Sequence, residues 1–303
     1  MDMRRLGLFL AVVDHGTFTQ AAAASYVSQP GLSQAVRALE SELGVALFER
    51  VGRGVQLTPA GVALVPHARR VARDVEAGRA AVAAVAGLLE GRVDLACLPT
   101  LAVDPVAPIV GAFRAQYPGV HVGLAGPADP ADLLSMVLNG AVELGITEAG
   151  DAMGSAVVHP IGDQDLVAVL PPGTRVPTRP LTLTELGRHP LVVTPPGTSS
   201  RAVLDDSLAA AGVTPRIAVE TAVRDAVVPL VLAGAGATVL PEALAASAGA
   251  LGAVVIATRP RLRRRVVLVH RDAELAPAAA ALRDMAVERE SGVRPARPRR
   301  IDA

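Results

Sequence analysis

The feature that most constrains this chain is a pair of short helix patterns near the N-terminus, each with its own start signal. Thr17 and Gln20 have the spacing of a capping box, which predicts a helix from about residue 18 to residue 25. Ser28 is placed to cap a second helix, and Gly44 follows it in a position suited to a left-handed C-cap. Two helices joined by so short a connection are typical of a helix-turn-helix.

The second of these helices has two unlike faces. Its apolar stripe recurs at helical spacing and consists of Leu32, Val36, Leu39 and Leu43. Its opposite face carries side chains that can bond base edges and phosphates in the major groove, namely Ser33, Gln34, Arg37 and Ser41. The pattern alone also fits a small helical bundle with an exposed polar face, and that alternative stays open here.

A short extended hairpin is predicted after the second helix. Gly52 and Gly54 lie between two short apolar segments, so the chain can turn there and form a small wing. Arg50 and Arg53 lie at its tip, where guanidinium groups favour backbone phosphates or the minor groove. A winged helix-turn-helix is therefore expected over residues 1–58.

These motifs together resemble the signature of LysR-type transcription regulators. The resemblance is carried by Ser28-Gln29-Pro30-Gly31-Leu32-Ser33, Leu39-Glu40, Leu43-Gly44, Leu47-Phe48, Arg50 and Thr58-Pro59-Ala60-Gly61. Gly31 departs from the pattern, because the family favours a small helix former, usually alanine, at that position. The resemblance implies that Gln29, Pro30, Ser33 and Gln34 approach bases and that Arg50 and Arg53 touch the backbone. The full set of expected DNA-binding residues is Thr17, Ser28, Gln29, Pro30, Ser33, Gln34, Arg37, Arg50 and Arg53.

A long helix is predicted over residues 59–90. Thr58 is a suitable N-cap, and Pro59 fits the first helical position. The apolar residues then alternate in steps of four and three, as in the seam of a coiled coil: Leu64, Ala68, Val71, Val75, Gly78, Val82, Val85 and Leu89. Such a stripe needs a partner, either a second chain or the helix's own domain. The family resemblance favours a linker helix that forms a dimer.

From residue 91 the pattern changes to alternating strands and helices. Strands are expected at 92–98, 120–125, 142–147, 165–170, 191–194, 216–220, 237–240 and 264–271, and helices at 104–117, 131–139, 199–211, 222–233 and 277–290. Repeated units of this kind imply two sheets, rich in parallel strands, covered by helices. The resemblance implies a two-subdomain α/β sensor over 91–290, similar to periplasmic binding proteins. Residues 291–303, rich in arginine and proline, are expected to be a disordered tail.

Ligands of such α/β folds lie beyond the carboxyl ends of the strands, where helix N-termini converge. Hydroxyl and backbone N–H groups at those places suit a carboxylate or another small anion. The expected effector-binding residues are Thr100, Leu101, Thr147, Pro196, Gly197, Thr198, Ser199 and Thr221. Each serine or threonine alone is equally a helix cap. Only their convergence in one cleft makes them a site.

Composition excludes several other classes of protein. The chain has 29 basic and 29 acidic residues, so it is not a uniformly basic protein that coats nucleic acid. Aromatic residues make up 2% of the chain, too few for the stacking platforms that bind single strands. Cys97 is the single cysteine, and the six histidines lack metal-ligand spacing. We therefore expect a reduced cytoplasmic protein without cofactor, metal or membrane contact. The arginine-rich stretch 259–265 is expected to be a solvated loop rather than a DNA site.

The expected function is that of a ligand-responsive regulator, not an enzyme. It is expected to bind double-stranded DNA at an interrupted palindrome as a homodimer or homotetramer, and to contact RNA polymerase if it is an activator. Two alternatives remain at this stage. An exported solute-binding protein would be cleaved near Ala24, after the apolar N-terminal segment. An enzyme would need a nucleophile triad, an acid–base pair or a metal set, and the sequence contains none in recognisable spacing.

Overall fold

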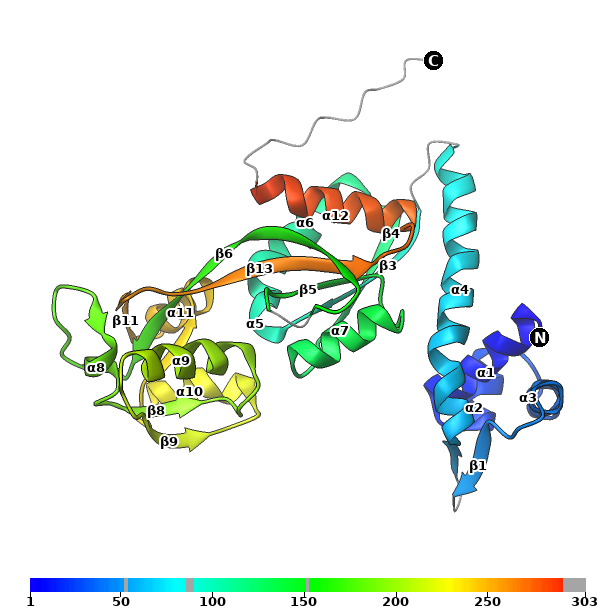
Figure 1. Ribbon diagram of the computed structural model, residues 1–303, viewed down its shortest axis with the longest axis horizontal. Coiled ribbons are helices and arrows are strands. Elements are labelled where there is room, and N and C mark those ends of the chain that lie inside the picture. Colours follow the sequence, from blue (N-terminus) through cyan, green and yellow to red (C-terminus); the bar gives the residue numbers. More distant parts are fainter. Residues whose placement is uncertain (52–53, 86–89, 151–152, 291–303) are drawn as a thin grey trace, which may run out of the picture.

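The computed structural model describes residues 1–51, 54–85, 90–150 and 153–290. Figure 1 shows a small N-terminal unit on one end of a long helix, α4, and a larger two-lobed unit that follows it in the chain. The predicted Arg53 and the predicted tail at 291–303 lie outside the described residues. In the part of the chain that is described, no helix is both long enough and apolar enough to cross a membrane.

The N-terminal unit consists of three helices and a hairpin. They are α1 (Met3–His15), α2 (Phe18–Ala24), α3 (Gln29–Leu43), β1 (Phe48–Val51) and β2 (Gly54–Leu57), the two strands pairing antiparallel. The predicted start signals act as expected: the hydroxyls of Thr17 and Ser28 accept hydrogen bonds from Gln20 N and Gly31 N at 3.2 Å each. Gly44 ends α3 at φ 70°, a left-handed conformation that glycine adopts without a Cβ clash.

The core of this unit confirms most of the predicted apolar stripe. Leu32, Val36 and Leu39 are at most 1% exposed, but Leu43, the last member of the stripe, is 40% exposed. The hairpin is fixed to α3 by the carboxylate of Glu40, which accepts hydrogen bonds from Leu47 N (2.8 Å) and Phe48 N (3.2 Å). The wing therefore has a defined position relative to α3.

Helix α4 (Pro59–Val85) leaves the N-terminal unit with much of its predicted seam uncovered. Ala68 is buried against the core of the N-terminal unit, whereas Val71 and Val75 are each 37% exposed and Val82 is 74% exposed. An apolar stripe exposed in this way indicates a surface that another chain can cover.

One segment of α4 packs against the two-lobed unit. Ala77 contacts the first of its apolar cores. Nearby, a Cβ atom placed on Gly140 would lie 2.8 Å from Arg73 Nη2 and 3.4 Å from Arg271 Cζ, so two guanidinium groups meet there. Burial and the charge of Arg271 both lower the pKa of Arg73. The Nε atoms of Arg73 and Arg271 are buried without a hydrogen-bond partner among the described residues.

Lobe I is built on three neighbouring parallel strands. These are β3 (Gly91–Cys97), β4 (Val120–Ala125) and β5 (Leu144–Glu148), with β3 in the middle. The helices of this lobe are α5 (Pro99–Leu101), η1 (Ala102–Val106), α6 (Ala107–Gln116), α7 (Pro130–Leu138) and α12 (Pro277–Glu290). The helix predicted over 104–117 thus begins three residues later, at Ala107.

Lobe II contains the elements between the two longest strands. Its helices are α8 (Leu183–Leu186), α9 (Ser199–Ala210), η2 (Arg224–Ala226), α10 (Val227–Leu232) and α11 (Glu242–Ala250). Its strands are β7 (Leu181–Thr182), β8 (Pro190–Val193), β9 (Arg216–Glu220), β10 (Thr238–Pro241), β11 (Val254–Ile256) and β12 (Thr258–Arg259). Helix α11 was absent from the sequence prediction, because its alanine-rich segment has no clear apolar stripe.

Two long antiparallel strands join the lobes. β6 (Ala156–Leu170) and β13 (Leu262–Arg271) pair with each other and run from one lobe into the other, as Figure 1 shows. They link β5 on one side and β10 on the other into one seven-stranded mixed sheet. The two-lobed α/β architecture is therefore confirmed, but the expectation of two sheets rich in parallel strands is wrong, because β6 and β13 connect the lobes through antiparallel pairing.

The arginine-rich stretch is also different from its prediction. It was expected to be a solvated loop, but its second half forms the start of β13, and Arg264 is only 4% exposed. Side chains alternate across a strand, so Arg263 and Arg265 point to the other face and pair with Asp165 and Asp163.

Candidate functional site

The exposed side of α3 carries a polar stripe. Gln29, Ser33 and Arg37 follow one another in steps of four, which places them on one side of the helix. Gln29 and Arg37 are exposed and Ser33 is half-buried. They share a hollow of about 450 Å³ with the start of α2 and with the wing. We call this hollow the recognition groove; its lining is Thr17, Phe18, Thr19, Gln29, Ser33, Val36, Arg37, Glu40, Phe48, Glu49, Gly54 and Val55.

The other predicted DNA-binding residues lie elsewhere on the same unit. Ser28 and Gln34 border a second hollow, together with Arg4 and Arg5 of α1. Pro30 is exposed in the first turn of α3. Arg50 lies on β1, in the wing. The predicted DNA-binding residues of α3 and its N-cap therefore lie on two sides of the helix, Gln29, Ser33 and Arg37 on one and Ser28 and Gln34 on the other.

Two residues of this unit were missed by sequence reasoning. Thr19 lines the recognition groove beside Thr17, and its position two residues after the N-cap could have indicated this. Tyr26 is 96% exposed in the connection between α2 and α3, with φ at 54°.

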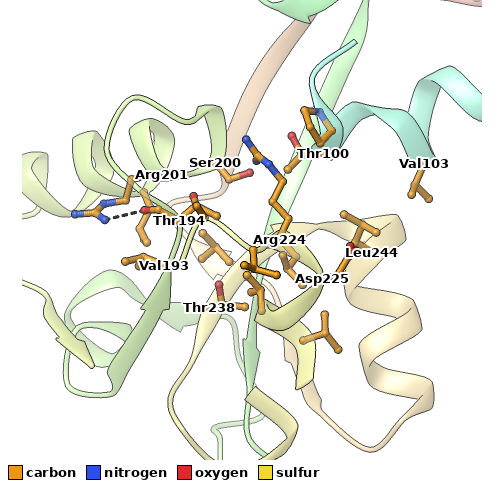
Figure 2. Close-up of a pocket in the computed structure, with 18 residues that line it drawn as sticks. Thr100, Val103, Val193, Thr194, Ser200, Arg201, Arg224, Asp225, Thr238 and Leu244 are labelled. Carbon is orange, nitrogen blue, oxygen red and sulfur yellow. Dashed lines mark hydrogen bonds between the residues drawn. The ribbon is translucent and has the colours of Figure 1, made fainter. Parts of the chain in front are cut away.

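The two-lobed unit contains a cavity of about 670 Å³ between lobe I and lobe II. Lobe I contributes Pro99, Thr100 and Val103, and lobe II contributes the rest of the lining (Figure 2). That lining is Val193, Thr194, Ser200, Arg201, Leu204, Ala222, Val223, Arg224, Asp225, Val227, Val228, Thr238, Val239, Leu240 and Leu244. A volume of this size is typical of sites for small molecules. We call it the interlobe cavity.

The predicted effector-binding residues are only partly brought together. Thr100 lines the interlobe cavity, whereas Leu101 is fully buried in the core of lobe I. Thr198 Oγ1 lies 2.5 Å from Thr194 Oγ1, and Thr221 Oγ1 accepts a hydrogen bond from Val223 N at 3.0 Å. Pro196 and Gly197 are exposed in the loop before α9. Thr147 is buried at the end of β5, and its hydroxyl has no hydrogen-bond partner among the described residues.

Ser199 belongs to a buried polar network centred on Arg264. The Arg264 guanidinium donates to Ser199 Oγ, to Thr100 Oγ1 at 3.0 Å and to the side-chain oxygen of Gln164. Ser199 Oγ in turn donates to the carboxylate of Glu148. Burial lowers the pKa of Arg264 to about 10, while the charge of Glu148 acts to raise it. The network joins Thr100 and Glu148 of lobe I to Ser199 of lobe II. It therefore fixes the positions of these polar side chains at the edge of the cavity.

Arg224 has a different environment. Its Nη2 atom donates to the backbone oxygen of Ala128 at 2.9 Å, which bridges the two lobes. No carboxylate of the described residues lies within 4 Å of its guanidinium, and burial lowers its pKa. In Figure 2 the guanidinium points toward Thr100 and Ser200. The Ser200 hydroxyl is buried and has no partner in the described part of the chain. Sequence reasoning missed Arg224, because nothing in its local sequence distinguishes it from an exposed arginine.

Metal or thiol chemistry finds little support in these residues. Within the four described segments, no group of three or more histidine, cysteine, aspartate or glutamate side chains is arranged to hold a metal ion. Cys97 is buried in lobe I, and burial raises the pKa of its thiol to about 11. The geometry describes an exposed polar groove and a partly enclosed cavity with fixed hydrogen-bonding groups.

Both parts of the chain match known family models. The model of the bacterial regulatory helix-turn-helix protein, lysR family, matches residues 3–62, and the model of the LysR substrate binding domain matches residues 86–291. The chain belongs to the LysR family. As a member of that family it is a DNA-binding transcription regulator with a substrate-binding C-terminal half, and not an enzyme.

Individual LysR-family proteins resemble the chain over most of its length. The nitrogen assimilation regulatory protein nac of Klebsiella aerogenes is 32% identical over 249 residues, which are 82% of this chain and 80% of that protein. A cysteine-to-aspartate variant of full-length OxyR from Pseudomonas aeruginosa matches with a TM-score of 0.75 at 20% identity, covering 95% of each chain. CbnR in complex with its target DNA matches with a TM-score of 0.70 at 24% identity, covering 96% of this chain and 100% of that one. These two solved structures show the fold that the chain shares.

Proposed function

We propose that this regulator binds an interrupted palindromic operator as a homodimer or homotetramer in the cytoplasm, and that a small anionic metabolite in the interlobe cavity changes this binding. The proposed parts are a DNA-binding domain (1–58), a dimerisation helix (59–90), an effector-binding domain (91–290) and a tail (291–303). If the operator-bound protein is an activator, RNA polymerase is a further partner.

The observation that carries the DNA half of this proposal is the polar stripe of α3. Gln29 and Arg37 are exposed on one side of a helix whose opposite side is buried. Helices of this kind enter the major groove and bond base edges with amide and guanidinium groups. The wing, held to α3 through Glu40, lies beside them and can reach the DNA backbone.

The effector half rests on Arg224 and the hydroxyls near it. An unpaired guanidinium in a partly enclosed cavity favours an anionic ligand, because the charge is poorly solvated until an anion binds. The partnerless hydroxyl of Ser200, which also lines the cavity, offers a further hydrogen bond. A ligand that binds one arrangement of the lobes better than another shifts the population toward it.

The oligomeric part rests on α4. Val71, Val75 and Val82 are exposed at the spacing of a coiled-coil seam. A second copy of the helix covers such a stripe, and a two-fold axis then relates two recognition helices. Two half-sites about one helical turn apart on the DNA follow from that symmetry.

Binding of the purified protein to the DNA upstream of its own gene tests the proposal. An electrophoretic shift against random competitor is expected to show specific retention. Gln29→Ala and Ser33→Ala are expected to weaken specific binding by about tenfold to a hundredfold, because a lost base contact affects only the matching sequence. Binding to random DNA, which depends on phosphate charge, is expected to stay unchanged.

Gln116→Ala, the same chemical change in lobe I, is the matched control and is expected to bind like the unmodified protein. Equal losses on operator and random DNA in Gln29→Ala would contradict base readout by α3. An absence of any binding at low salt would overturn the proposed function.

A further inference from the structure

Three arginines lie in or beside the interlobe cavity, and two of them already have side-chain partners of their own. Arg201 donates to Thr194 O at 3.0 Å, and its guanidinium lies 2.7 Å from Asp205 and 3.3 Å from Glu220. In Figure 2 it points away from Arg224. Arg264 is held by its buried network, and the negative charge of Glu148 lies close to it. Neither guanidinium is therefore available as the main partner of a ligand.

Arg224 is the cavity-lining arginine that has no carboxylate within 4 Å among the described residues. Its remaining N–H groups lie near Thr100 and near the partnerless hydroxyl of Ser200. A guanidinium presents paired donors that match the two oxygens of one carboxylate. The carboxylate of Asp225 also lines the cavity and disfavours a second negative charge on the ligand. The charged groups therefore fit one anionic group and not two.

The rest of the lining is mainly aliphatic. The larger aliphatic residues of the lining are Val103, Val193, Leu204, Val227, Val228, Val239, Leu240 and Leu244, and Thr194 and Thr238 lie among them. Aliphatic walls stabilise a ligand in proportion to the apolar surface that leaves water, and they offer no partner to a polar group on that part of the ligand. At about 670 Å³, the cavity is larger than a carboxylate alone needs.

We propose that the effector is a monocarboxylate with an apolar aliphatic or aryl body, whose carboxylate is bound by Arg224 and whose body packs against the aliphatic wall. This inference rests on the proposed function, because it assumes that the interlobe cavity is where the effector binds. Beyond the proposed function, the inference specifies that the ligand has one negative charge and an apolar body, and that its carboxylate faces Arg224.

Isothermal titration calorimetry on the full chain tests this with acetate, butanoate, hexanoate and phenylacetate. Affinity is expected to rise about fourfold for each methylene added from acetate to hexanoate, since each one buries apolar surface. Hexanamide, which lacks the charge, and hexanedioate, which adds a second carboxylate in the apolar part, are each expected to bind at least about tenfold more weakly than hexanoate.

Arg224→Gln is expected to remove the preference for hexanoate over hexanamide while keeping the effect of chain length. Arg216→Gln, a change of an exposed arginine on β9, is the matched control and is expected to keep both. Equal binding of hexanedioate and hexanoate, or a full carboxylate preference in Arg224→Gln, would overturn the inference. So would the absence of binding by all four acids in protein that still retains its operator, an outcome that leaves the DNA-binding half of the proposed function intact.

Discussion

The recognition groove and the interlobe cavity are built in opposite ways. The polar residues of α3 that line the groove lie within twelve positions of one another, are at least partly exposed and belong to a helix whose start is fixed by a cap. The cavity draws its polar residues from segments more than a hundred positions apart and buries several of them. In the groove the polar side chains are exposed to solvent. At the edge of the cavity most polar side chains are hydrogen-bonded to one another. The difference separates exposed residues, which are available to a partner, from buried residues, which hold the shape of a site.

The buried network gives the largest expected effect. Arg264→Met removes the donors that Ser199, Thr100 and Gln164 share and leaves Glu148 without its buried cation. Breaking a buried charged network in this way is expected to cost about 3–5 kcal/mol of unfolding free energy. Chemical denaturation followed by circular dichroism measures it.

Arg263→Met is the control for this change, one residue away on the same strand. Its guanidinium is exposed and pairs with Asp165 at the surface, where such a pair contributes about 0–1 kcal/mol. A similar loss of unfolding free energy in both variants would show that the buried network does not stabilise the two-lobed unit. It would also contradict the difference between the cavity and the groove.

The N-cap of α2 gives an intermediate effect. Thr17→Ala removes the hydroxyl that accepts from Gln20 N and is expected to destabilise the N-terminal unit by about 1 kcal/mol. Thermal unfolding monitors it, and Thr17→Ser, which keeps the hydroxyl, should restore most of the loss. A Thr17→Ser protein as unstable as Thr17→Ala would mean that the methyl group, not the cap, matters.

The smallest effect concerns Cys97, which reports on lobe I alone. Because the raised pKa of about 11 keeps the folded thiol protonated, alkylation by iodoacetamide is expected to stay slow at pH 8 and to accelerate toward pH 11. The folded state holds this proton more tightly than the unfolded state, so stability falls as pH rises from about 8.5 toward 11. Thr17→Ala should leave the labelling rate unchanged. Faster labelling in that variant would mean that the N-terminal unit and lobe I do not unfold independently.

The same contrast explains what the sequence could and could not predict. Caps such as Thr17 and Ser28, the stop at Gly44 and the stripe of α3 depend on contacts between near neighbours, so spacing alone predicts them. Strand β13 was correctly expected from residue 264, but the burial of Arg264 was not, because only pairing with β6 shows that this side chain faces inward. Arg224 and Ser200 lie on different elements of lobe II, η2 and α9, and come together through tertiary packing that no local pattern encodes. Some of the predicted threonines are turn or core residues instead: the Thr221 hydroxyl accepts from Val223 N in a turn, and Thr147 is buried in lobe I.

The contact between α4 and lobe I bears on how the two ends of the molecule communicate. Arg73 and Arg271 meet at Gly140 with like charges, and each leaves a buried N–H group unpaired. Each such group costs about 1–3 kcal/mol, so this contact is less stable than one in which both guanidinium groups are fully hydrogen-bonded. A coupling free energy of about 1–3 kcal/mol is typical between two sites of a protein. The cost of the unpaired groups is of the same size, so a change in lobe I that alters this contact also alters how α4 is held.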